Sequence, residues 1–315
     1  MSTINDHPSR IDRCGELRAH PESLDALWKE SRILHFSDGY ISCGSDSSSL
    51  RYLSTDEYQG LIESKKFAVG ERYFLGKDAS TGQSYFAWNS KRSGNEKNEE
   101  NRDGYLTLRD LGSSLSALDF EIGLHAVALS NWHNSHPHCS RCGAATTVDL
   151  GGAVRVCSKD LSQHHPRTDS AVIVLIRDRD DRILLGHQPI WPEGRFSCFA
   201  GFLEPGETFE QCVSREVFEE SGVRLSKISY LGSQPWPFPA SIMIAFDALA
   251  VDPKAARPDG EEITEVKWFT RAELKAQAAD GSVLLPPVMS VAYRMISRWF
   301  AEVDSSPLVG KTVGR

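Results

Sequence analysis

The sequence lacks any apolar run long enough to cross a membrane. Its first twenty residues also lack the apolar stretch of a signal peptide. Cysteine is sparse, with seven residues in 315, and two of the seven form a CxxC pair, a usage typical of a reducing compartment. We therefore expect a cytoplasmic protein with no membrane partner.

Basic residues are fewer than acidic residues. The chain carries 35 lysines and arginines against 43 aspartates and glutamates, a formal net charge of −8, which argues against a general nucleic-acid binder. The balance does not exclude an RNA end as substrate, because a bound metal or a basic pocket can override the global field. No internal repeat is evident, and 315 residues with 40% hydrophobic content suit about two soluble domains.

The composition changes near residues 135 and 168, which divides the chain into three parts. We predict an N-terminal α+β domain at 1–135, a small cysteine-containing segment at 136–167 and a second domain at 168–315. The first part is the least informative, and its polar stretch at 95–104 is typical of an exposed loop.

The periodicity of the rest predicts mixed helices and strands. We expect a helix at 119–132, a hairpin at 171–186, strands at 242–250 and 265–269, a helix after Thr270, a helix at about 287–302 and a frayed end at 304–315.

The most informative stretch runs from Gly201 to Val223, GFLEPGETFEQCVSREVFEESGV. Thr208 and Gln211 have capping-box spacing, so a helix should begin at Phe209, and Gly222 should end it.

Glu216 and Glu220 fall within the apolar arc of this helix, which is formed by Phe209, Cys212, Val213 and Val217. Two like charges at i,i+4 cost a helix about 0.2–0.5 kcal/mol even when exposed, and more when buried. A solvated acidic face would not place its acids among apolar side chains, so we expect a divalent cation between these carboxylates and a phosphate. Arg215 is better placed as the ion-pair partner of Glu207.

A second metal is indicated by Cys139, Cys142 and Cys157, which have the spacing of a structural zinc ribbon. The fourth ligand is ambiguous. We favour His164, with Asp160 and His165 as alternatives, and loss of the metal is the competing interpretation.

The stretch from Gly201 to Val223 matches the signature of the Nudix hydrolases. A CxxCG ribbon directly before it, together with the segment SQPWPFPAS at 233–241, resembles the NADH pyrophosphatase family of these hydrolases. The resemblance covers about residues 128–292. It implies an α+β protein, namely a Nudix α/β/α sandwich with a mixed sheet, preceded by a zinc ribbon and a small N-terminal α+β domain.

The resemblance also implies residue roles. Mg²⁺ or Mn²⁺, two to three per site, would be held by Glu216, Glu220, the backbone carbonyl of Ala200 and a later acid, which should be Glu262 with Glu261 as its rival. Glu219 would be a further ligand or the general base, a role it shares with Glu220. The expected substrate-binding residues are Phe202, His165, Gln234, Pro235, Trp236, Pro237, Phe238, Pro239, Ala240, Ser241, Glu262 and Ala292.

The implied reaction is metal-dependent hydrolysis of the pyrophosphate bond of NADH or NAD⁺ to nicotinamide mononucleotide and AMP, or the same cut at the 5′ end of NAD-capped RNA. One structural zinc per chain and a homodimer are also implied. The alternatives are a Nudix pyrophosphatase for ADP-ribose or a dinucleoside polyphosphate, and a non-catalytic nucleotide sensor. A sensor would need a broken acid set, whereas all the acids are present.

Overall fold

The computed structural model describes residues 8–91, 104–304 and 306–313. The chain forms two compact units. The N-terminal unit contains Pro8–Thr168 and Pro237–Ala240, and the C-terminal unit contains Asp169–Trp236 and the chain from Ser241 onward. The loop expected at 95–104 lies outside the described residues except for Gly104.

The N-terminal unit is built on a seven-stranded sheet with the order β1-β5-β6-β2-β3-β7, in which β4 pairs with β2. Its strands are β1 (Ile11–Asp12), β2 (Arg32–Ser37), β3 (Tyr40–Ser42), β4 (Tyr52–Leu53), β5 (Glu71–Asp78), β6 (Ser84–Asn89) and β7 (Tyr105–Leu106). Its helices are α1 (Pro21–Trp28), α2 (Thr55–Glu63), α3 (Leu108–Leu111) and α4 (Ala117–Ser135).

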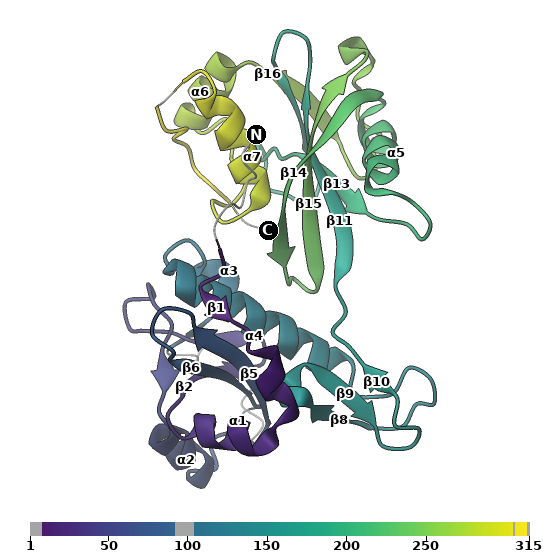
Figure 1. The fold of residues 1–315 in the computed structure, drawn as a ribbon. Coiled ribbons are helices and arrows are strands. Elements are labelled where there is room, and N and C mark those ends of the chain that lie inside the picture. Colours follow the sequence, from purple (N-terminus) through teal and green to yellow (C-terminus); the bar gives the residue numbers. More distant parts are fainter. Residues whose placement is uncertain (1–7, 92–103, 305, 314–315) are drawn as a thin grey trace. The chain divides into compact units, whose positions relative to one another are not determined.

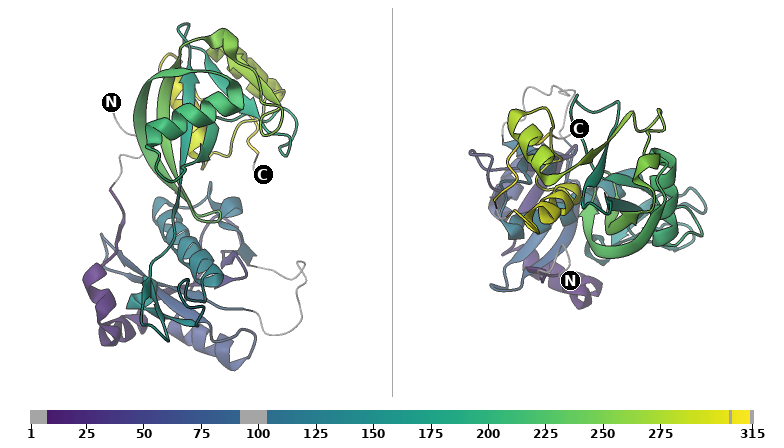
Figure 2. Two further views of the ribbon diagram at one scale, coloured as in Figure 1. Left: turned by 90° about the vertical axis from the view of Figure 1, so that its right-hand side faces the viewer. Right: turned by 90° about the horizontal axis from the view of Figure 1, so that it is seen from above.

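Helix α4 includes the helix expected at 119–132 and packs along this sheet (Figure 2). Its buried residues Ile122, Ala126 and Leu129 join Leu34 and Tyr73 in one apolar cluster. A second cluster on α1 contains Trp28 with strand residues of β2, β5 and β6. The sheet is therefore covered by apolar side chains on both faces.

The cysteine-containing segment forms a three-stranded sheet of β8 (Thr146–Asp149), β9 (Val154–Cys157) and β10 (Gln163–His164). Buried Arg155 attaches it to the larger sheet of the same unit. The guanidinium lies 2.9 Å from His133 Nδ1 and donates at 3.3 Å to Glu71, while its Nε donates to Thr146 Oγ1 at 2.7 Å. The cysteine-containing segment thus packs with the N-terminal residues in one compact unit. The division into three domains stays a prediction.

The C-terminal unit contains a six-stranded mixed sheet with the order β14-β15-β11-β12-β16, in which β13 pairs with β11. Its strands are β11 (Asp169–Arg177), β12 (Ile183–His187), β13 (Phe199–Phe202), β14 (Leu225–Trp236), β15 (Ser241–Ala250) and β16 (Glu265–Phe269). Its helices are α5 (Phe209–Ser221), α6 (Arg271–Asp280) and α7 (Val291–Ala301). Strand β11 pairs with β15 in parallel and with β12 and β13 antiparallel.

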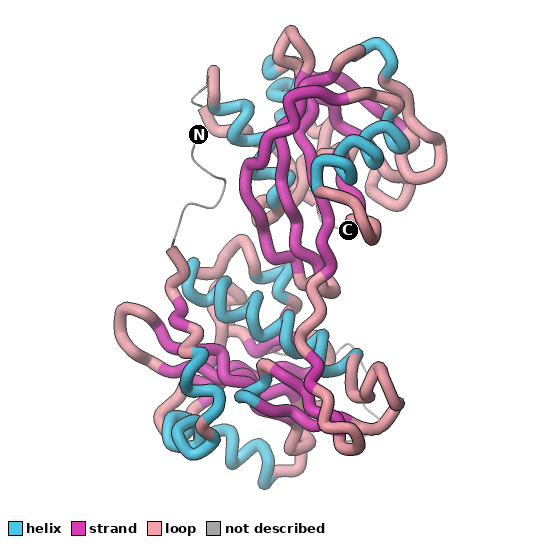
Figure 3. Tube along the Cα trace, turned by 45° about the vertical axis from the view of Figure 1, so that its right-hand side comes forward, coloured by secondary structure: helices cyan, strands magenta, loops and turns pink. Residues whose placement is uncertain are grey.

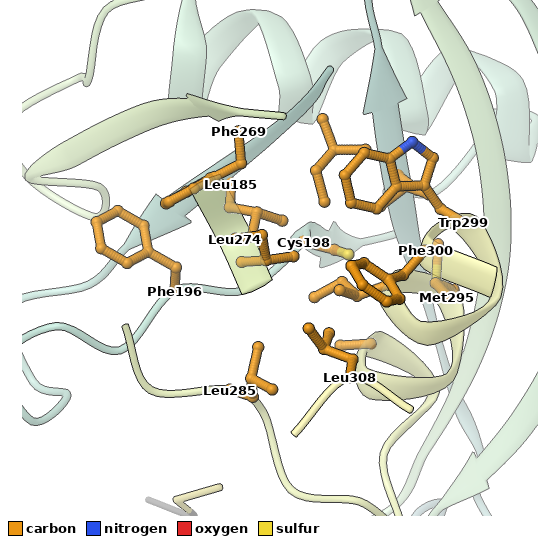
Figure 4. Packing of buried hydrophobic residues seen from close by; sticks show 14 of the residues in the cluster. Leu185, Phe196, Cys198, Phe269, Leu274, Leu285, Met295, Trp299, Phe300 and Leu308 are labelled. Atoms are coloured by element: carbon orange, nitrogen blue, oxygen red, sulfur yellow. The ribbon is translucent and has the colours of Figure 1, made fainter. Parts of the chain in front are cut away.

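Helix α5 lies on one side of this sheet, and α6 and α7 lie on the other (Figures 1 and 3). The alternation of side chains along β11 explains the two layers. Val172 and Val174 pack with α5, whereas Ile173 and Leu175 join the cluster of α6 and α7. Figure 4 shows residues of that second cluster, among them Leu274, Met295, Trp299 and Phe300. This is the α/β/α sandwich with a mixed sheet that the sequence predicted.

Most predicted elements of this unit are confirmed: the hairpin, both strands and the helix after Thr270. The last helix begins at Val291, later than expected. The expectation of a frayed end is wrong for the described residues, because Leu308 is buried in the core and Leu285 exchanges backbone hydrogen bonds with Lys311 and Val313.

Candidate functional site

Helix α5 carries the central side chains, and its ends are fixed by local sequence. Thr208 accepts from Gln211 N–H, and the Gln211 side chain accepts from Thr208 N–H, which completes the predicted capping box. Gly222 ends the helix with φ 67°, a conformation that costs glycine little. The helix therefore starts and stops where the motif requires, and its register is set.

That register turns two carboxylates toward the sheet. Glu220 is 3% exposed, and Glu216 is half-buried. Burial, together with the negative charges of Glu216, Glu262 and Asp259, raises the pKa of Glu220 to about 8. Burial likewise raises the pKa of Glu216, against the attraction of Arg215. The site thus concentrates acids that are costly to ionise by themselves.

Arg215 acts as the predicted internal ion-pair partner. Its Nε and Nη2 bind both oxygens of Glu207 at 2.7 and 2.9 Å, and Nη2 also donates to the carbonyl of Phe202 at 3.0 Å. Its Nη1 lies 2.9 Å from Glu216 and 3.0 Å from Glu219. Arg215 holds the pKa of Glu207 down at about 2. The Arg215 guanidinium therefore links Glu207, in the loop before α5, to Glu216 and Glu219 on the helix.

Gly201 lies directly against the Glu216 carboxylate. A Cβ at this position would overlap the carboxyl carbon and both of its oxygens. Gly201 belongs to β13 and pairs with Val172 of β11, so it cannot move away without breaking the ladder. The first glycine of the motif is thus required by contact with an acid rather than by its backbone freedom.

Glu262 lies in the loop before β16 and adds a third negative charge to the site. Its charge raises the pKa of both Glu216 and Glu220, and neither shift has Glu261 among its main causes. Asp259 shapes this loop, because its Oδ1 accepts from Glu261 N–H and from Ile263 N–H, both at 2.9 Å. The two pKa shifts support Glu262 over Glu261 as the later acid, which stays a prediction. Asp259 was missed from the sequence, although an aspartate two residues before a loop amide is a usual turn signal.

The donor set fits a hard divalent cation. Glu220 Oε2 is buried and receives no hydrogen bond from any residue the structure describes. A buried carboxylate oxygen without a donor costs about 1–3 kcal/mol or more, and a cation ligated by carboxylates removes that cost. The backbone of Ala200 also contacts Glu220, since its hydrogen bond lowers the pKa of that carboxyl. Glu216, Glu262 and the backbone of Ala200 thus all act on Glu220, and their role as metal ligands stays a prediction.

The residues expected to bind substrate fall in different places. Phe202 is 60% exposed at the end of β13, which leaves its ring open to a ligand. Ala292 is 5% exposed in the core of the C-terminal unit. Gln234 is buried, and both polar atoms of its amide are hydrogen-bonded: Nε2 donates to Met289 O at 2.7 Å and Oε1 accepts from Val291 N–H at 2.6 Å.

The rest of the 233–241 segment is divided. Pro235 and Trp236 end β14, Ser241 begins β15, and the four residues between them form a turn that groups with the N-terminal unit. In that unit Phe238 packs on the α4 cluster, 4.6 Å below the guanidinium of Arg109. Pro237 O and Pro239 O accept from the Asn131 amide. His165 is exposed in the same unit.

The cysteine cluster is also assembled. Ligand atoms of Cys139, Cys142, Cys157 and Asp160 all lie within 4.8 Å of one another. The two sulfurs of Cys142 and Cys157 are 3.5 Å apart. His164, the ligand favoured from the sequence, is not in this group and instead lies 3.2 Å from Ser162 Oγ. Three thiolates and a carboxylate are a donor set that suits Zn²⁺.

Comparison with known families gives two matches. Residues 167–286 match the NUDIX domain, and residues 134–164 match the NADH pyrophosphatase zinc ribbon domain. A NUDIX hydrolase of known structure from Nitrosomonas europaea is 22% identical, with a TM-score of 0.41, over 56% of this chain and 96% of its own. Within the described residues, every helix is too short or too polar to span a bilayer.

Two relatives illustrate the sequence similarity. The protein named NAD-capped RNA hydrolase NudC of Mycobacterium bovis (strain BCG / Pasteur 1173P2) is 41% identical over 205 residues, which are 62% of this chain and 65% of that protein. The human protein named NAD-capped RNA hydrolase NUDT12 is 36% identical over 218 residues, 65% of this chain and 47% of that protein. The chain thus spans slightly less than two thirds of the mycobacterial relative.

Proposed function

Because the chain carries a NUDIX domain and an NADH pyrophosphatase zinc ribbon domain, we propose that it hydrolyses the pyrophosphate bond of NADH or NAD⁺. The products would be nicotinamide mononucleotide and AMP. The observation that carries the proposal is the buried carboxylate pair of α5, in which Glu220 keeps an oxygen without a hydrogen-bond donor. The names of the two relatives extend the proposal to the NAD cap of an RNA 5′ end.

In this proposal Glu216, Glu220, Glu262 and the carbonyl of Ala200 hold Mg²⁺ or Mn²⁺, with two to three ions per site. The bound ions would neutralise the phosphates and lower the pKa of the attacking water. Arg215 fixes Glu216 and Glu219 relative to one another through its Nη1.

The proton of the attacking water requires an acceptor. Glu219 is exposed, and only its Oε2 is engaged by Arg215, so its Oε1 is the better acceptor. Glu220 is the alternative, but a carboxylate committed to a cation has fewer lone pairs to offer.

The test is a product assay with Mg²⁺ or Mn²⁺ on NADH, NAD⁺, ADP-ribose, a diadenosine polyphosphate and an NAD-capped RNA. Glu220→Gln should lower turnover of every substrate by about 100-fold or more. Glu210→Gln is the matched control, because Glu210 lies on the exposed first turn of the same helix. Turnover of the Glu220 variant within a few fold of wild type would remove the metal assignment.

Substrate choice is tested separately at the aromatic residues. Phe202 and Trp236 lie at strand ends in the C-terminal unit, and aromatic faces suit nicotinamide and adenine rings. Phe202→Ala and Trp236→Ala should reduce turnover of NADH more than that of ADP-ribose, which lacks the nicotinamide. Phe238→Ala is less informative because the ring is packed in the N-terminal unit. Equal losses on both substrates would favour a general nucleotide pyrophosphatase.

We also propose a homodimer, on the family resemblance alone. Sedimentation equilibrium of the full chain measures this directly. A monomer at the concentrations of the assay would end this part of the proposal.

A further inference from the structure

The ribbon contains two turns of the same design, and the first holds two cysteines. Gly143 N–H donates to Cys139 O at 2.9 Å, and Cys139 N–H donates to Ala144 O at 2.8 Å. Arg141 N–H points at Cys139 Sγ, 3.4 Å away. Gly143 has φ 72°, which lets the chain turn directly after Cys142. This arrangement directs two sulfurs to one point.

The second turn repeats each of these contacts. Leu161 N–H donates to Cys157 O at 3.2 Å, and Cys157 N–H donates to Ser162 O at 2.9 Å. Lys159 N–H points at Cys157 Sγ, 3.4 Å away. Leu161 has φ 59°, although a residue with a Cβ is strained there. Asp160 precedes it, as Cys142 precedes Gly143 in the first turn.

Matching 139–144 to 157–162 places Asp160 at the position of Cys142. We propose that Asp160 is the fourth zinc ligand of the ribbon and that His164 stays outside the coordination sphere. The distances agree, since Asp160 Oδ2 lies 3.8 Å from Cys139 Sγ and a carboxylate oxygen of Asp160 lies within 4.8 Å of all three sulfurs. This assignment replaces the preference for His164 that the sequence suggested.

Ser162 explains how Asp160 is oriented. Its N–H and its Oγ–H both donate to Asp160 Oδ1, at 2.9 and 2.6 Å, which leaves Oδ2 for a metal. His164 Nε2 contacts the same Oγ at 3.2 Å. Asp160, Ser162 and His164 therefore form a chain of polar contacts that leads away from the metal position. Such contacts to a ligand fix its orientation in metal sites.

The chemistry distinguishes this site from one with four thiolates. A carboxylate oxygen is a harder donor than sulfur, and soft thiolates favour Zn²⁺. A Cys₃Asp site should therefore release zinc more readily to a chelator than the same ribbon with a fourth cysteine. The assignment of Asp160 does not depend on the hydrolase activity, so failure of one proposal would leave the other intact.

The test measures zinc in the full-length protein with three variants. Asp160→Ala should lose at least half of its one zinc equivalent by elemental analysis after gel filtration, whereas His164→Ala should keep it. Asp160→Cys should resist a competing chelator such as pyridylazoresorcinol about tenfold longer than wild type. Zinc lost from His164→Ala and kept by Asp160→Ala would overturn the proposal.

X-ray absorption at the zinc edge decides the matter even if Asp160→Ala does not fold. Wild type and His164→Ala should both show three sulfur neighbours and one light neighbour without the outer-shell signal of an imidazole. Asp160→Cys should show four sulfurs. An imidazole signal that disappears in His164→Ala, or a wild-type protein that binds no zinc, contradicts the assignment.

Discussion

Glu220 allows a quantitative prediction about proton release. A carboxyl with a pKa of about 8 is about 90% protonated at pH 7 and about 10% protonated at pH 9. A divalent cation binds the carboxylate, so the proton must leave when the metal enters. Binding of Mg²⁺ should therefore release about 0.9 proton from this residue at pH 7 and about 0.1 at pH 9. Glu220→Gln has no proton to lose here.

The same raised pKa contributes to the pH dependence of the stability of the metal-free protein. The pKa of Glu220 rises from 4.5 in the unfolded chain to about 8 in the folded one. Below pH 4.5 the carboxyl is protonated in both states and costs nothing. As the pH rises from 4.5 to 8, only the unfolded state ionises, so the free energy of unfolding falls by on the order of 4–5 kcal/mol. Glu220→Gln should remove this decline, and bound metal should offset it in wild type.

The assay is titration calorimetry with Mg²⁺ in two buffers of different ionisation enthalpy, at pH 7, 8 and 9. Dialysis without a chelator prepares the protein and leaves the cysteine cluster undisturbed. Glu210→Gln, with its acid on the exposed first turn, should release protons as wild type does. Proton release that does not change with pH, or that persists undiminished in Glu220→Gln, would refute the assignment of the raised pKa to this residue.

Three further predictions concern other parts of the structure. Gly201→Ala should lower Mg²⁺ affinity and turnover by about 100-fold, because the new methyl group displaces the Glu216 carboxylate; unchanged calorimetry would contradict this. Arg215→Lys should lower the free energy of unfolding of the C-terminal unit by about 1–2 kcal/mol in urea, because a lysine cannot replace the bidentate contacts of a partly exposed guanidinium; a loss below about 0.5 kcal/mol would contradict it. Residues 143 and 161 both have positive φ, which favours glycine. Leu161→Gly should therefore raise the free energy of unfolding of the zinc-loaded protein by about 0.5–1 kcal/mol, and Gly143→Ala should lower it by about 1 kcal/mol. Changes of the opposite sign in thermal unfolding would refute the structural match between the two turns.

The sequence predicted helix α5 well because its determinants are local. Caps, the terminal glycine and the apolar arc all lie within Thr208–Gly222, so no tertiary knowledge is needed to place Glu216 and Glu220 on the inner face. The pair Arg215 and Glu207 is also close in sequence, and it is confirmed.

Elements stabilised by distant contacts were harder to predict. Strand β14 contains Ser226, Lys227 and Gly232, and its pairing with β15 shifts register twice. Its sequence therefore lacks the regular alternation of apolar and polar residues that would predict a strand. The C-terminal end is polar apart from a few residues, yet Leu308 enters the core and the backbone nearby pairs with Leu285. Both are held by partners far along the chain, which no local pattern reveals.

The preference for His164 over Asp160 as the fourth zinc ligand had a different reason. A positive φ at a leucine is not a sequence signal, so the turn after Asp160 could not be recognised as the copy of the turn at Gly143. The histidine at 164 was favoured because its type is a common zinc ligand, whereas the structure offers a carboxylate at the matching place.

The segment SQPWPFPAS shows how a motif can combine two roles. Its Gln234 amide binds Met289 O and the N–H of Val291, the first residue of α7, which is one of the donors that a helix start leaves unsatisfied. This amide is needed to seat α7 whatever the substrate is, because a buried polar group without its partners costs stability. The motif therefore has a structural role in addition to the substrate contacts proposed for it. In the proposed function, discrimination between NADH and other pyrophosphates would come from residues with an accessible ring, and exposed Phe202 meets that requirement more fully than packed Phe238.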